Sequence, residues 1–248
     1  MNFFWNIYHS VFSYNFLKKF ENSLKYPKKY YKFCELFLES HSNLKLKQHR
    51  LYYKENQRAF GEDAFTSMWT LLYERYKFHN FLEIGVYRGQ TLSLITLLAG
   101  LYKCKTTVVG ITPLESSGDS VSSYPEINYY EDIKNNFLKF NLALPKIIKA
   151  YSTDDAAIIA IKSTIWDCIY IDGNHDYENV KADFNNVIPN LKKGGIIVFD
   201  DASLNLIPEK FHGMFRGHPG PSNFVDEISN SKFEEILRVG HNRCFRKL

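Results

Sequence analysis

The sequence lacks the paired cysteines that thiolate metal sites and disulfide frameworks require. Its four cysteines, Cys34, Cys104, Cys168 and Cys244, lie far apart and form no C-x-x-C pair. This spacing argues against a thiolate zinc site and against a small scaffold held together by disulfides. Reduced, widely spaced thiols are typical of a cytoplasmic protein, and we expect that location here.

Long apolar runs and concentrated charge are also missing. No apolar stretch reaches the roughly 18 residues that a membrane-spanning helix needs. A net charge of +4, with Lys and Arg widely scattered, gives no sign of nucleic-acid binding. Residues 1–17 contain no Asp, Glu, Lys or Arg, so they lack the basic start of a secretory signal. We expect this aromatic segment to pack on the domain or in a homo-oligomer; contact of residues 1–20 with a membrane surface is the alternative.

The 248 residues are enough for one large domain with an appendage. Residues 1–60 mix aromatic residues with lysines and have few strand-like runs, which predicts a helical N-terminal appendage, either a lid or an oligomer contact. Residues 61–248 form the predicted main domain. It begins with a helix over residues 62–77, where apolar residues recur at helical spacing.

After this helix, apolar runs alternate with amphipathic segments. The predicted strands are 80–85, 106–112, 146–151, 167–172 and 195–201, and the predicted helices between them are 90–100, 131–142 and 177–191. Nearly continuous apolar strands of this kind predict a parallel sheet covered on both faces. Residues 233–248 predict an antiparallel hairpin around Gly-His-Asn. The fold class is therefore a doubly wound, mostly parallel, seven-stranded α/β sheet with an antiparallel C-terminal hairpin.

The stretch FLEIGVYRGQTLSLI, residues 81–95, predicts a buried strand, a glycine-containing turn and a helix. It lacks the G-x-G-x-x-G of dinucleotide sites, so a nicotinamide oxidoreductase is disfavoured. Its E-x-G-x-x-x-G spacing instead resembles motif I of the class I S-adenosylmethionine-dependent methyltransferases. The resemblance implies S-adenosylmethionine as cofactor. The residues that it implies for cofactor binding are Glu83, Gly85, Val86, Tyr87 and Gly89, and Asp172 at the end of the fourth predicted strand is expected at the cofactor as well.

Two further strand ends bear on the cofactor. Class I methyltransferases contact adenine after the third strand, which implies Ser152 and Thr153 here. After the second strand, the family places an acidic residue for the ribose hydroxyls. This sequence has Thr112 at that point and Glu115 three residues later. Either Glu115 reaches back to the ribose or the ribose is held in another way.

Carboxylates follow the last two parallel strands. Asp172 ends the fourth predicted strand, and Asp200 and Asp201 end the fifth. Adjacent strands lie about 4.8 Å apart, so these side chains are expected to converge at one edge of the cofactor pocket. Converging carboxylates repel one another unless a cation lies between them. An all-oxygen set suits Mg²⁺ better than zinc.

The pattern I-D-G-x-H-x-Y…G-G-I-I-V-F-D-D, within residues 169–201, resembles the metal-dependent sugar O-methyltransferases of the macrocin and mycinamicin type. The resemblance covers residues 81–201. It implies that Asp172, Asp200 and Asp201 bind magnesium and that His175 is the general base. Asn174 stands where relatives often have aspartate, which leaves His175 for that role.

Residues 202–224 are rich in loop-forming residues and are predicted to form a substrate lid over the pocket. His212, Arg216 and His218 are its candidates for contacts with anionic substrate groups. The expected acceptor is a hydroxyl of a sugar or glycosylated metabolite. A phenol or catechol acceptor is the first alternative, and a non-catalytic module that binds the cofactor or a partner is the second.

Overall fold

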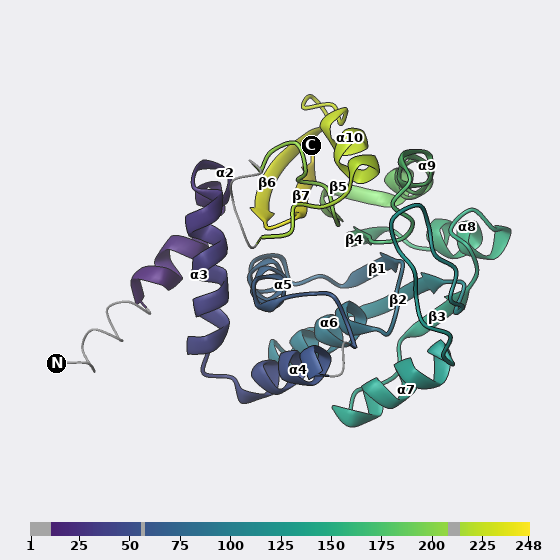
Figure 1. Cartoon of the computed structure of the whole chain (residues 1–248), viewed down its shortest axis with the longest axis horizontal. Coiled ribbons are helices and arrows are strands. Elements are labelled where there is room, and N and C mark those ends of the chain that lie inside the picture. Colours follow the sequence, from purple (N-terminus) through teal and green to yellow (C-terminus); the bar gives the residue numbers. More distant parts are fainter. Residues whose placement is uncertain (1–10, 56–57, 208–213) are drawn as a thin grey trace.

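The computed structural model describes residues 11–55, 58–207 and 214–248. A seven-stranded sheet with strand order β3-β2-β1-β4-β5-β7-β6 forms its centre (Figure 1). The strands are β1 (Asn80–Ile84), β2 (Thr107–Thr112), β3 (Lys146–Lys149), β4 (Trp166–Ile171), β5 (Leu191–Phe199), β6 (Phe233–Val239) and β7 (Asn242–Lys247). The first five pair in parallel, and β7 runs antiparallel to both β5 and β6. The predicted fold class is confirmed.

The order of the strands places the carboxyl ends of β1 and β4 side by side. β1 pairs with β2 on one side and with β4 on the other, so the chain reverses its direction of winding at β1. Ligands of open α/β sheets bind beyond the strand ends at such a point. Four of the five β1 residues and all six of β4 are buried, because helices cover both faces of the sheet.

The sheet separates two apolar clusters, and helices cover the cluster on each face. The first face is covered by α5 (Asp63–Tyr76), α6 (Gln90–Leu101) and α7 (Tyr129–Lys139). The second is covered by α8 (Asp155–Lys162), α9 (Tyr177–Val187) and α10 (Pro219–Asp226). The short helix η2 (Ile188–Asn190) follows α9.

The N-terminal helices extend the first cluster. Residues 11–18 are helical, followed by α2 (Glu21–Lys25), α3 (Pro27–Ser40) and α4 (Leu44–Lys54). Leu17 and Tyr30 are fully buried in the same cluster as α5 and α6. The Ser23 hydroxyl accepts a 2.9 Å hydrogen bond from the backbone N–H of Arg238 in β6. The predicted helical segment is therefore packed into the main core, while the boundary at residue 60 stays a prediction.

Two helices differ from the sequence expectation. No helix was predicted between the third and fourth strands, where α8 forms from a short segment of eight residues. The predicted lid loop contains α10, which begins with proline at its first helical position. Proline is favoured there because that N–H would have no partner inside the helix. Within the described ranges, no helix is long and apolar enough to cross a membrane. Residues 1–10 lie outside those ranges.

Candidate active site

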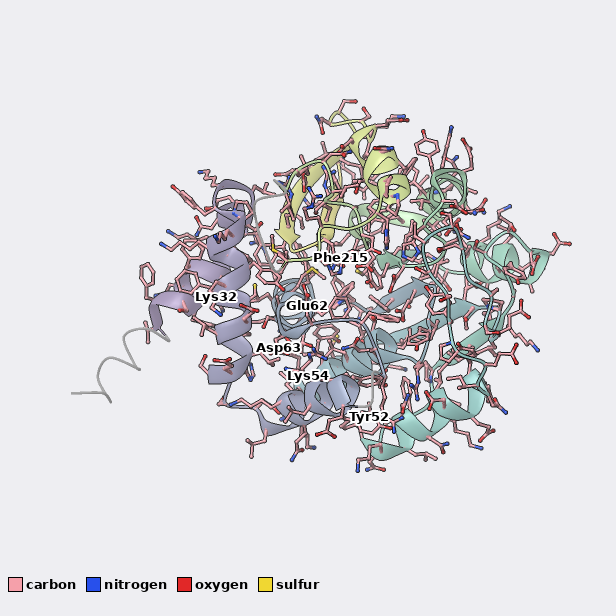
Figure 2. The ribbon with its side chains drawn as sticks, in the orientation of Figure 1. Lys32, Tyr52, Lys54, Glu62, Asp63 and Phe215 are labelled. Atoms are coloured by element: carbon pink, nitrogen blue, oxygen red, sulfur yellow. The ribbon has the colours of Figure 1, made fainter. Side chains whose placement is uncertain are left out.

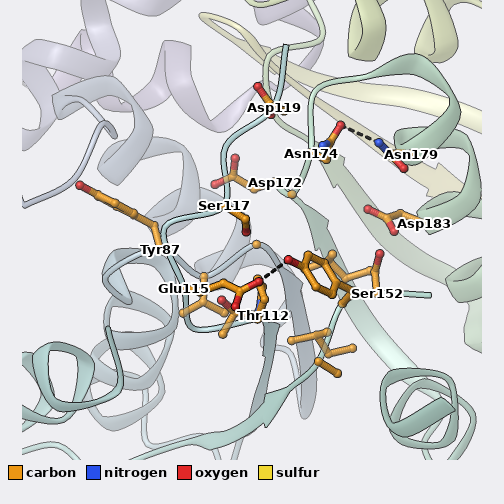
Figure 3. A pocket seen from close by; sticks show the side chains of 18 of the residues that line it. Tyr87, Thr112, Glu115, Ser117, Asp119, Ser152, Asp172, Asn174, Asn179 and Asp183 are labelled. Atoms are coloured by element: carbon orange, nitrogen blue, oxygen red, sulfur yellow. Dashed lines mark hydrogen bonds between the residues drawn. The ribbon is translucent and has the colours of Figure 1, made fainter. Parts of the chain in front are cut away.

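Two cavities open beyond the carboxyl ends of the parallel strands and share one wall. The first, of about 390 Å³, lies over the ends of β1, β2 and β4 (Figure 3). The second, of about 560 Å³, extends from Glu83 towards the end of β5 and the turn before β7. The residues that line both cavities are Val86, Tyr87, Tyr124 and Asp172. The two cavities therefore adjoin at these residues, and a ligand in one can lie next to a ligand in the other.

The glycine-containing turn shapes the first cavity. Gly85 has φ +87°, and a β-carbon there would lie 1.8 Å from the backbone oxygen of Asp172. Only glycine therefore permits the close approach of the β1 turn to the end of β4. Gly89, with φ +81°, precedes the first residue of α6 but lines neither cavity. Val86 and Tyr87, between the two glycines, line both.

Glu83 is fully buried at the wall of the second cavity, and burial raises the pKa of its carboxyl well above the ordinary value. Hydrogen bonds from Thr91 and from the backbone of Leu92 oppose that rise. Its Oε2 atom has no hydrogen-bond partner among the described residues. A buried acceptor of this kind costs free energy unless a ligand satisfies it. The ammonium of a methionine moiety is such a donor, so the site fits the predicted cofactor.

The far end of the first cavity is polar. Ser152 and Thr153, both predicted from the sequence, line it beside Thr112 and Glu115. Glu115 accepts a hydrogen bond from the Tyr151 hydroxyl, which places an acidic side chain in the cavity despite Thr112. Glu115 could therefore contact a ribose in this cavity, although it lies three residues after Thr112, the position where the family usually has an acidic residue.

Asp183 of α9 also lines the first cavity, and the sequence interpretation missed it. Burial raises the pKa of its carboxyl to about 6, although a Ser152 hydrogen bond opposes the shift. Its Oδ1 atom has no partner among the described residues. The only sequence signal was a polar residue on the buried face of an amphipathic helix.

Two of the predicted carboxylates, Asp172 and Asp200, interact at the ends of β4 and β5, and both are partly buried. Burial and the Asp200 charge raise the pKa of Asp172 well above its ordinary value. Burial acts in the same direction on Asp200, but the facing His241 outweighs it and lowers the pKa of Asp200 to about 2. The Asp200 charge therefore favours the neutral form of Asp172, and a place of this kind suits a cation.

His175 lies between two carboxylates. Its Nδ1 atom is 2.6 Å from Asp119 Oδ2, and its Nε2 atom is 3.1 Å from Asp201 Oδ2. Burial alone would lower the pKa of His175, but Asp201 and Asp119 outweigh it and raise the pKa to about 9. At neutral pH, without a cation, the ring is an imidazolium.

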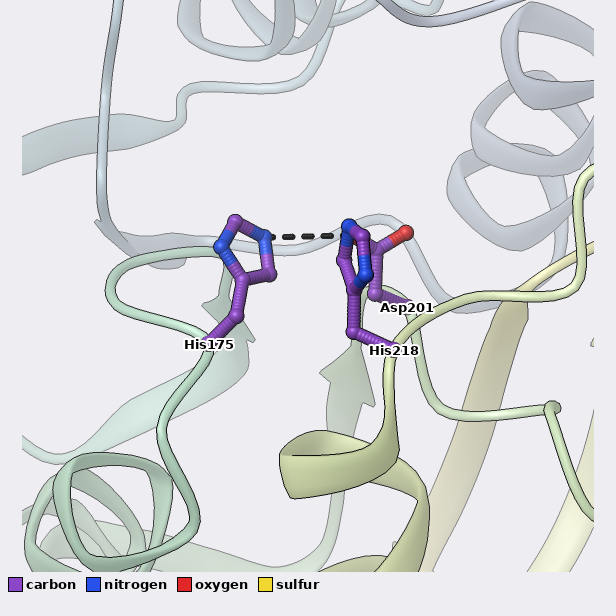
Figure 4. Close-up of side chains that lie close together, drawn as sticks. All are labelled: His175, Asp201 and His218. Carbon is purple, nitrogen blue, oxygen red and sulfur yellow. Dashed lines mark ion pairs between the residues drawn. The ribbon is translucent and has the colours of Figure 1, made fainter. Parts of the chain in front are cut away.

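Three histidines from different parts of the chain, His175, His218 and His241, lie close to Asp201. His218, just before α10, places Nε2 3.5 Å from Asp201 Oδ2, and Figure 4 shows an ion pair that links His175 to this carboxylate, with His218 beside it. His241, in the β6–β7 turn, lies 3.2 Å from Asp200 Oδ1 and 3.9 Å from Asp201 Oδ1. Burial would lower the pKa of His241, but Asp200 outweighs it and raises the pKa to about 9.

Sequence reasoning missed Asp119 and His241. Asp119 lies in the long loop after β2, and His241 belongs to the Gly-His-Asn turn that predicted the hairpin. Neither position belongs to the motifs at the strand ends, so only the tertiary structure reveals them. Of the lid candidates, His218 reaches the second cavity, and Arg216 is not among the residues that line either one. His212 lies outside the described residues.

Aromatic side chains form part of the second cavity's wall. Phe60, Tyr87 and Tyr124 pack in series, with ring centroids 5.2 and 5.3 Å apart. Phe215 packs on the rings of His218 and His241, and it lines the cavity together with polar groups such as Glu62; both residues are labelled in Figure 2. The cavity thus combines flat apolar faces with hydrogen-bonding groups.

One segment of the chain is similar to a known domain family. Residues 82–202 match the family model of a methyltransferase domain. An uncharacterized protein of Acanthamoeba polyphaga mimivirus is 36% identical over 126 residues, which cover 49% of this chain and 50% of that protein. The chain therefore spans about half the length of the curated relative that it matches.

Solved structures share the fold. A Staphylococcus aureus protein provisionally named a caffeoyl-CoA O-methyltransferase aligns with a TM-score of 0.61 at 14% identity, over 86% of this chain and 96% of that chain. The Bacillus cereus O-methyltransferase in complex with S-adenosylhomocysteine aligns at 0.58 and 16% identity, over 84% and 93%. The Podospora anserina methyltransferase PaMTH1, also bound to S-adenosylhomocysteine, aligns at 0.57 and 15%, over 89% and 96%.

Proposed function

We propose that the protein is an S-adenosylmethionine-dependent methyltransferase that transfers the cofactor's methyl group to a hydroxyl of a sugar or glycosylated small molecule. The match of residues 82–202 to the family model of a methyltransferase domain supports this proposal. The observation that carries this proposal is the pair of cavities that meet at Tyr87, Tyr124 and Asp172. Methyl transfer requires the sulfonium and the acceptor oxygen to be aligned and in contact, and a shared wall provides that contact.

The first cavity is assigned to the cofactor. Gly85 lets the chain approach the ligand closely, and Ser152 and Thr153 face the adenosine end. Glu83 lines the adjoining second cavity, so its unpartnered oxygen would be reached by the methionine end where the two cavities meet. When bound, S-adenosylmethionine supplies an electrophilic methyl group on a positively charged sulfur. The buried carboxyl groups nearby favour that positive charge.

The second cavity is assigned to the acceptor, with His175 as the general base. A hydroxyl is a poor nucleophile until its proton is removed, and a correctly placed base contributes typically about 10²–10⁴-fold to the rate. Asp119 holds the Nδ1 side of the ring, so Nε2 is the atom that faces the cavity. His175 must lose its Nε2 proton before it can accept one from the acceptor.

Magnesium assistance is a further part of the proposal. Asp172, Asp200 and Asp201 would hold the ion, and the Asp200 charge that raises the pKa of Asp172 marks a place where positive charge is favoured. Mg²⁺ prefers such oxygen ligands. A bound ion would polarise the acceptor hydroxyl and, by neutralising Asp201, would lower the pKa of His175.

The composition of the second cavity favours a polyhydroxylated acceptor over a phenol. Its wall includes hydrogen-bonding side chains such as Glu62, Gln90 and His218, and aromatic faces at Phe60 and Phe215 on which a sugar ring can stack. A phenol methylator would be expected to have an apolar slot instead. We therefore keep the phenol and catechol acceptors as the second candidate, and place the non-catalytic module third because all three predicted carboxylates are present.

Calorimetric titration with S-adenosylhomocysteine, in the presence of a chelator, tests the cofactor first. We expect micromolar binding in the wild type and none in Gly85→Ala. Radiolabelled S-adenosylmethionine with a panel of sugars, nucleotide-sugars and phenols, with and without Mg²⁺, then tests the acceptor. Absence of S-adenosylhomocysteine binding under all conditions would reject the proposal, and methylation of phenols alone would move the second candidate forward.

A further inference from the structure

Two histidines beside Asp201, His175 and His218, are placed so that they could bind a metal ion other than the proposed magnesium. His175 Nε2 lies 3.1 Å and His218 Nε2 3.5 Å from the same oxygen, Asp201 Oδ2. One donor atom from each of the three side chains lies within 4.8 Å of the others (Figure 4). We infer that His175, His218 and Asp201 form a binding site for a transition-metal dication of the Zn²⁺, Co²⁺ or Mn²⁺ class.

The spacing of the donor atoms fits such an ion. Nitrogen and oxygen ligands lie about 2.0–2.2 Å from Zn²⁺, so two ligands of a tetrahedral ion are about 3.3 Å apart. The separations of Asp201 Oδ2 from the two imidazole nitrogens, 3.1 and 3.5 Å, are on either side of that value. An ion can therefore enter with only small side-chain movements.

The second imidazole nitrogen of His175 gives an independent indication. Metal-binding histidines nearly always donate their other N–H to a carboxylate or a carbonyl, which fixes the ring and the tautomer. Asp119 Oδ2 lies 2.6 Å from His175 Nδ1 and accepts the His175 backbone N–H at 2.9 Å. Asp119 is itself fixed by the backbone N–H groups of Val121 and Ser122. Nδ1 of His175 is therefore occupied by its contact with Asp119, and Nε2 is the nitrogen that can bind an ion.

The backbone holds the two ligands on the Asp201 side together. The His218 N–H donates a 2.9 Å hydrogen bond to the Asp201 carbonyl, and the Ser222 hydroxyl donates to the same oxygen at 3.1 Å. Asp201 itself has φ +52°, a left-handed conformation that non-glycine residues rarely adopt. Strain of this kind persists where the surrounding structure enforces it, often at functional sites.

The start of α10 is also held against the His175 loop. A β-carbon on Gly220 would lie 2.1 Å from the His175 backbone oxygen, so glycine is needed for this contact. Gly217 meets the Asp201 backbone in the same way, at 2.1 Å. The three ligand-bearing segments are therefore packed on one another before any ion is present, which reduces the conformational entropy lost on binding.

The chemical types of the three ligands indicate which metal ions the site would bind. Two imidazoles and one carboxylate suit Zn²⁺, Co²⁺, Mn²⁺ or Fe²⁺, whereas Mg²⁺ prefers oxygen ligands throughout. All three side chains line the acceptor cavity, so the remaining coordination position faces that cavity. An ion here occupies Nε2 of His175, and a nitrogen bound to a metal cannot accept a proton. Under the proposed function, a transition metal at this site therefore inhibits methyl transfer, although the binding itself does not rest on that function.

Metal binding is tested on tag-free, chelator-stripped protein without cofactor or acceptor. Equilibrium dialysis against Co²⁺ or Zn²⁺, with metal content measured by mass spectrometry, should give one tightly bound ion that excess Mg²⁺ does not displace. His218→Gln should weaken binding at least about tenfold. Asp119→Asn, which keeps all three ligands, should weaken it about 10–100-fold. His79→Gln, which changes an exposed histidine, is the matched control and should bind as the wild type does.

A signal from the unmutated protein makes the test independent of how the variants fold. Zn²⁺ should shift the Nε2 resonances of two histidines in ¹⁵N spectra of the wild-type protein. Equal binding by wild type and His218→Gln, or displacement of Co²⁺ by Mg²⁺, would overturn the inference. Binding of S-adenosylhomocysteine in chelator is measured separately, so loss of that binding alone counts against the proposed function and not against the metal site.

Discussion

Asp119 Oδ2 lies 2.6 Å from His175 Nδ1, although the two residues are 56 positions apart in the sequence. The contact joins the long loop after β2 to the turn after β4, and its two partners are almost completely buried. A charge-assisted hydrogen bond of this length is strong and directional. It fixes which nitrogen of His175 faces the acceptor cavity, whether that nitrogen accepts a proton or binds an ion.

Asp119→Asn should therefore lower the pKa of His175. The carboxylates of Asp201 and Asp119 keep this pKa at about 9 against the opposing effect of burial, and the substitution removes one of the two charges. NMR titration of the histidine ring signals, in metal-free protein, measures the change. Asp155→Asn, at an exposed position in α8, is the control. An unchanged His175 pKa in Asp119→Asn would mean that the pair does not form in solution.

Gly85→Ala should abolish cofactor binding and destabilise the fold. Alanine disfavours φ +87°, and its β-carbon would lie 1.8 Å from the Asp172 carbonyl oxygen, so β1 and β4 must separate locally. We expect S-adenosylhomocysteine affinity to fall at least about 100-fold and the free energy of unfolding to fall by more than about 1 kcal/mol.

Gly100→Ala is the matched control for that substitution. It lies in α6, where a β-carbon would meet nothing within 4 Å and alanine is the better helix former. Calorimetry and thermal unfolding should show wild-type affinity and equal or slightly higher stability. Similar losses in both variants would contradict the close-approach argument.

The strands, the glycine-containing turn and the carboxylates at the strand ends could be predicted from the sequence. The parallel strands were predictable because β1 and β4 are almost continuously apolar, and the cofactor turn because Gly85 stands at a motif-specific spacing. Asp172, Asp200 and Asp201 could be placed at one sheet edge because parallel strands end at the same side. All of these features are local or follow directly from the topology.

The features that were missed depend on contacts between distant segments. Asp119 and His241 approach the site from loops whose paths no periodicity describes, and His241 was interpreted only as part of a hairpin turn. Asp183 was assigned to a helix whose polar residues are ordinarily exposed, yet it faces the cofactor cavity. The helix α10 was hidden by its Pro-Gly-Pro start, which resembles a loop in composition.

Asp183→Asn should stabilise the protein at pH 7. Burial raises the pKa of Asp183 from 3.8 to about 6, so the folded state binds more protons than the unfolded state between those values. Stability from this group therefore falls as pH rises through that window, and the ionised carboxylate remains unfavourable at pH 7. We expect a gain of about 1–3 kcal/mol in urea unfolding. S-adenosylhomocysteine affinity should fall in the same variant, because Asp183 lines the cofactor cavity.

The buried His49 should make stability depend on pH in the opposite sense. Its Nε2 atom is 2.8 Å from the Ser93 hydroxyl, and burial, with the nearby Arg50, lowers its pKa from 6.5 to about 3. Between these values the unfolded state binds more protons, so the contribution of neutral His49 is complete above pH 6.5 and is lost as pH falls towards 3. From pH 7 to pH 5 this loss amounts to about 2 kcal/mol.

His49→Gln removes the titrating group, so the variant should be less stable than the wild type at pH 7, and the difference should shrink by about 2 kcal/mol at pH 5. Ser93→Ala is the control, because it removes the hydrogen bond of His49 Nε2 but keeps the buried ring. Its deficit in urea unfolding should be nearly the same at both pH values. A His49→Gln deficit that does not shrink would mean that the imidazole reaches water and takes up a proton in the folded state.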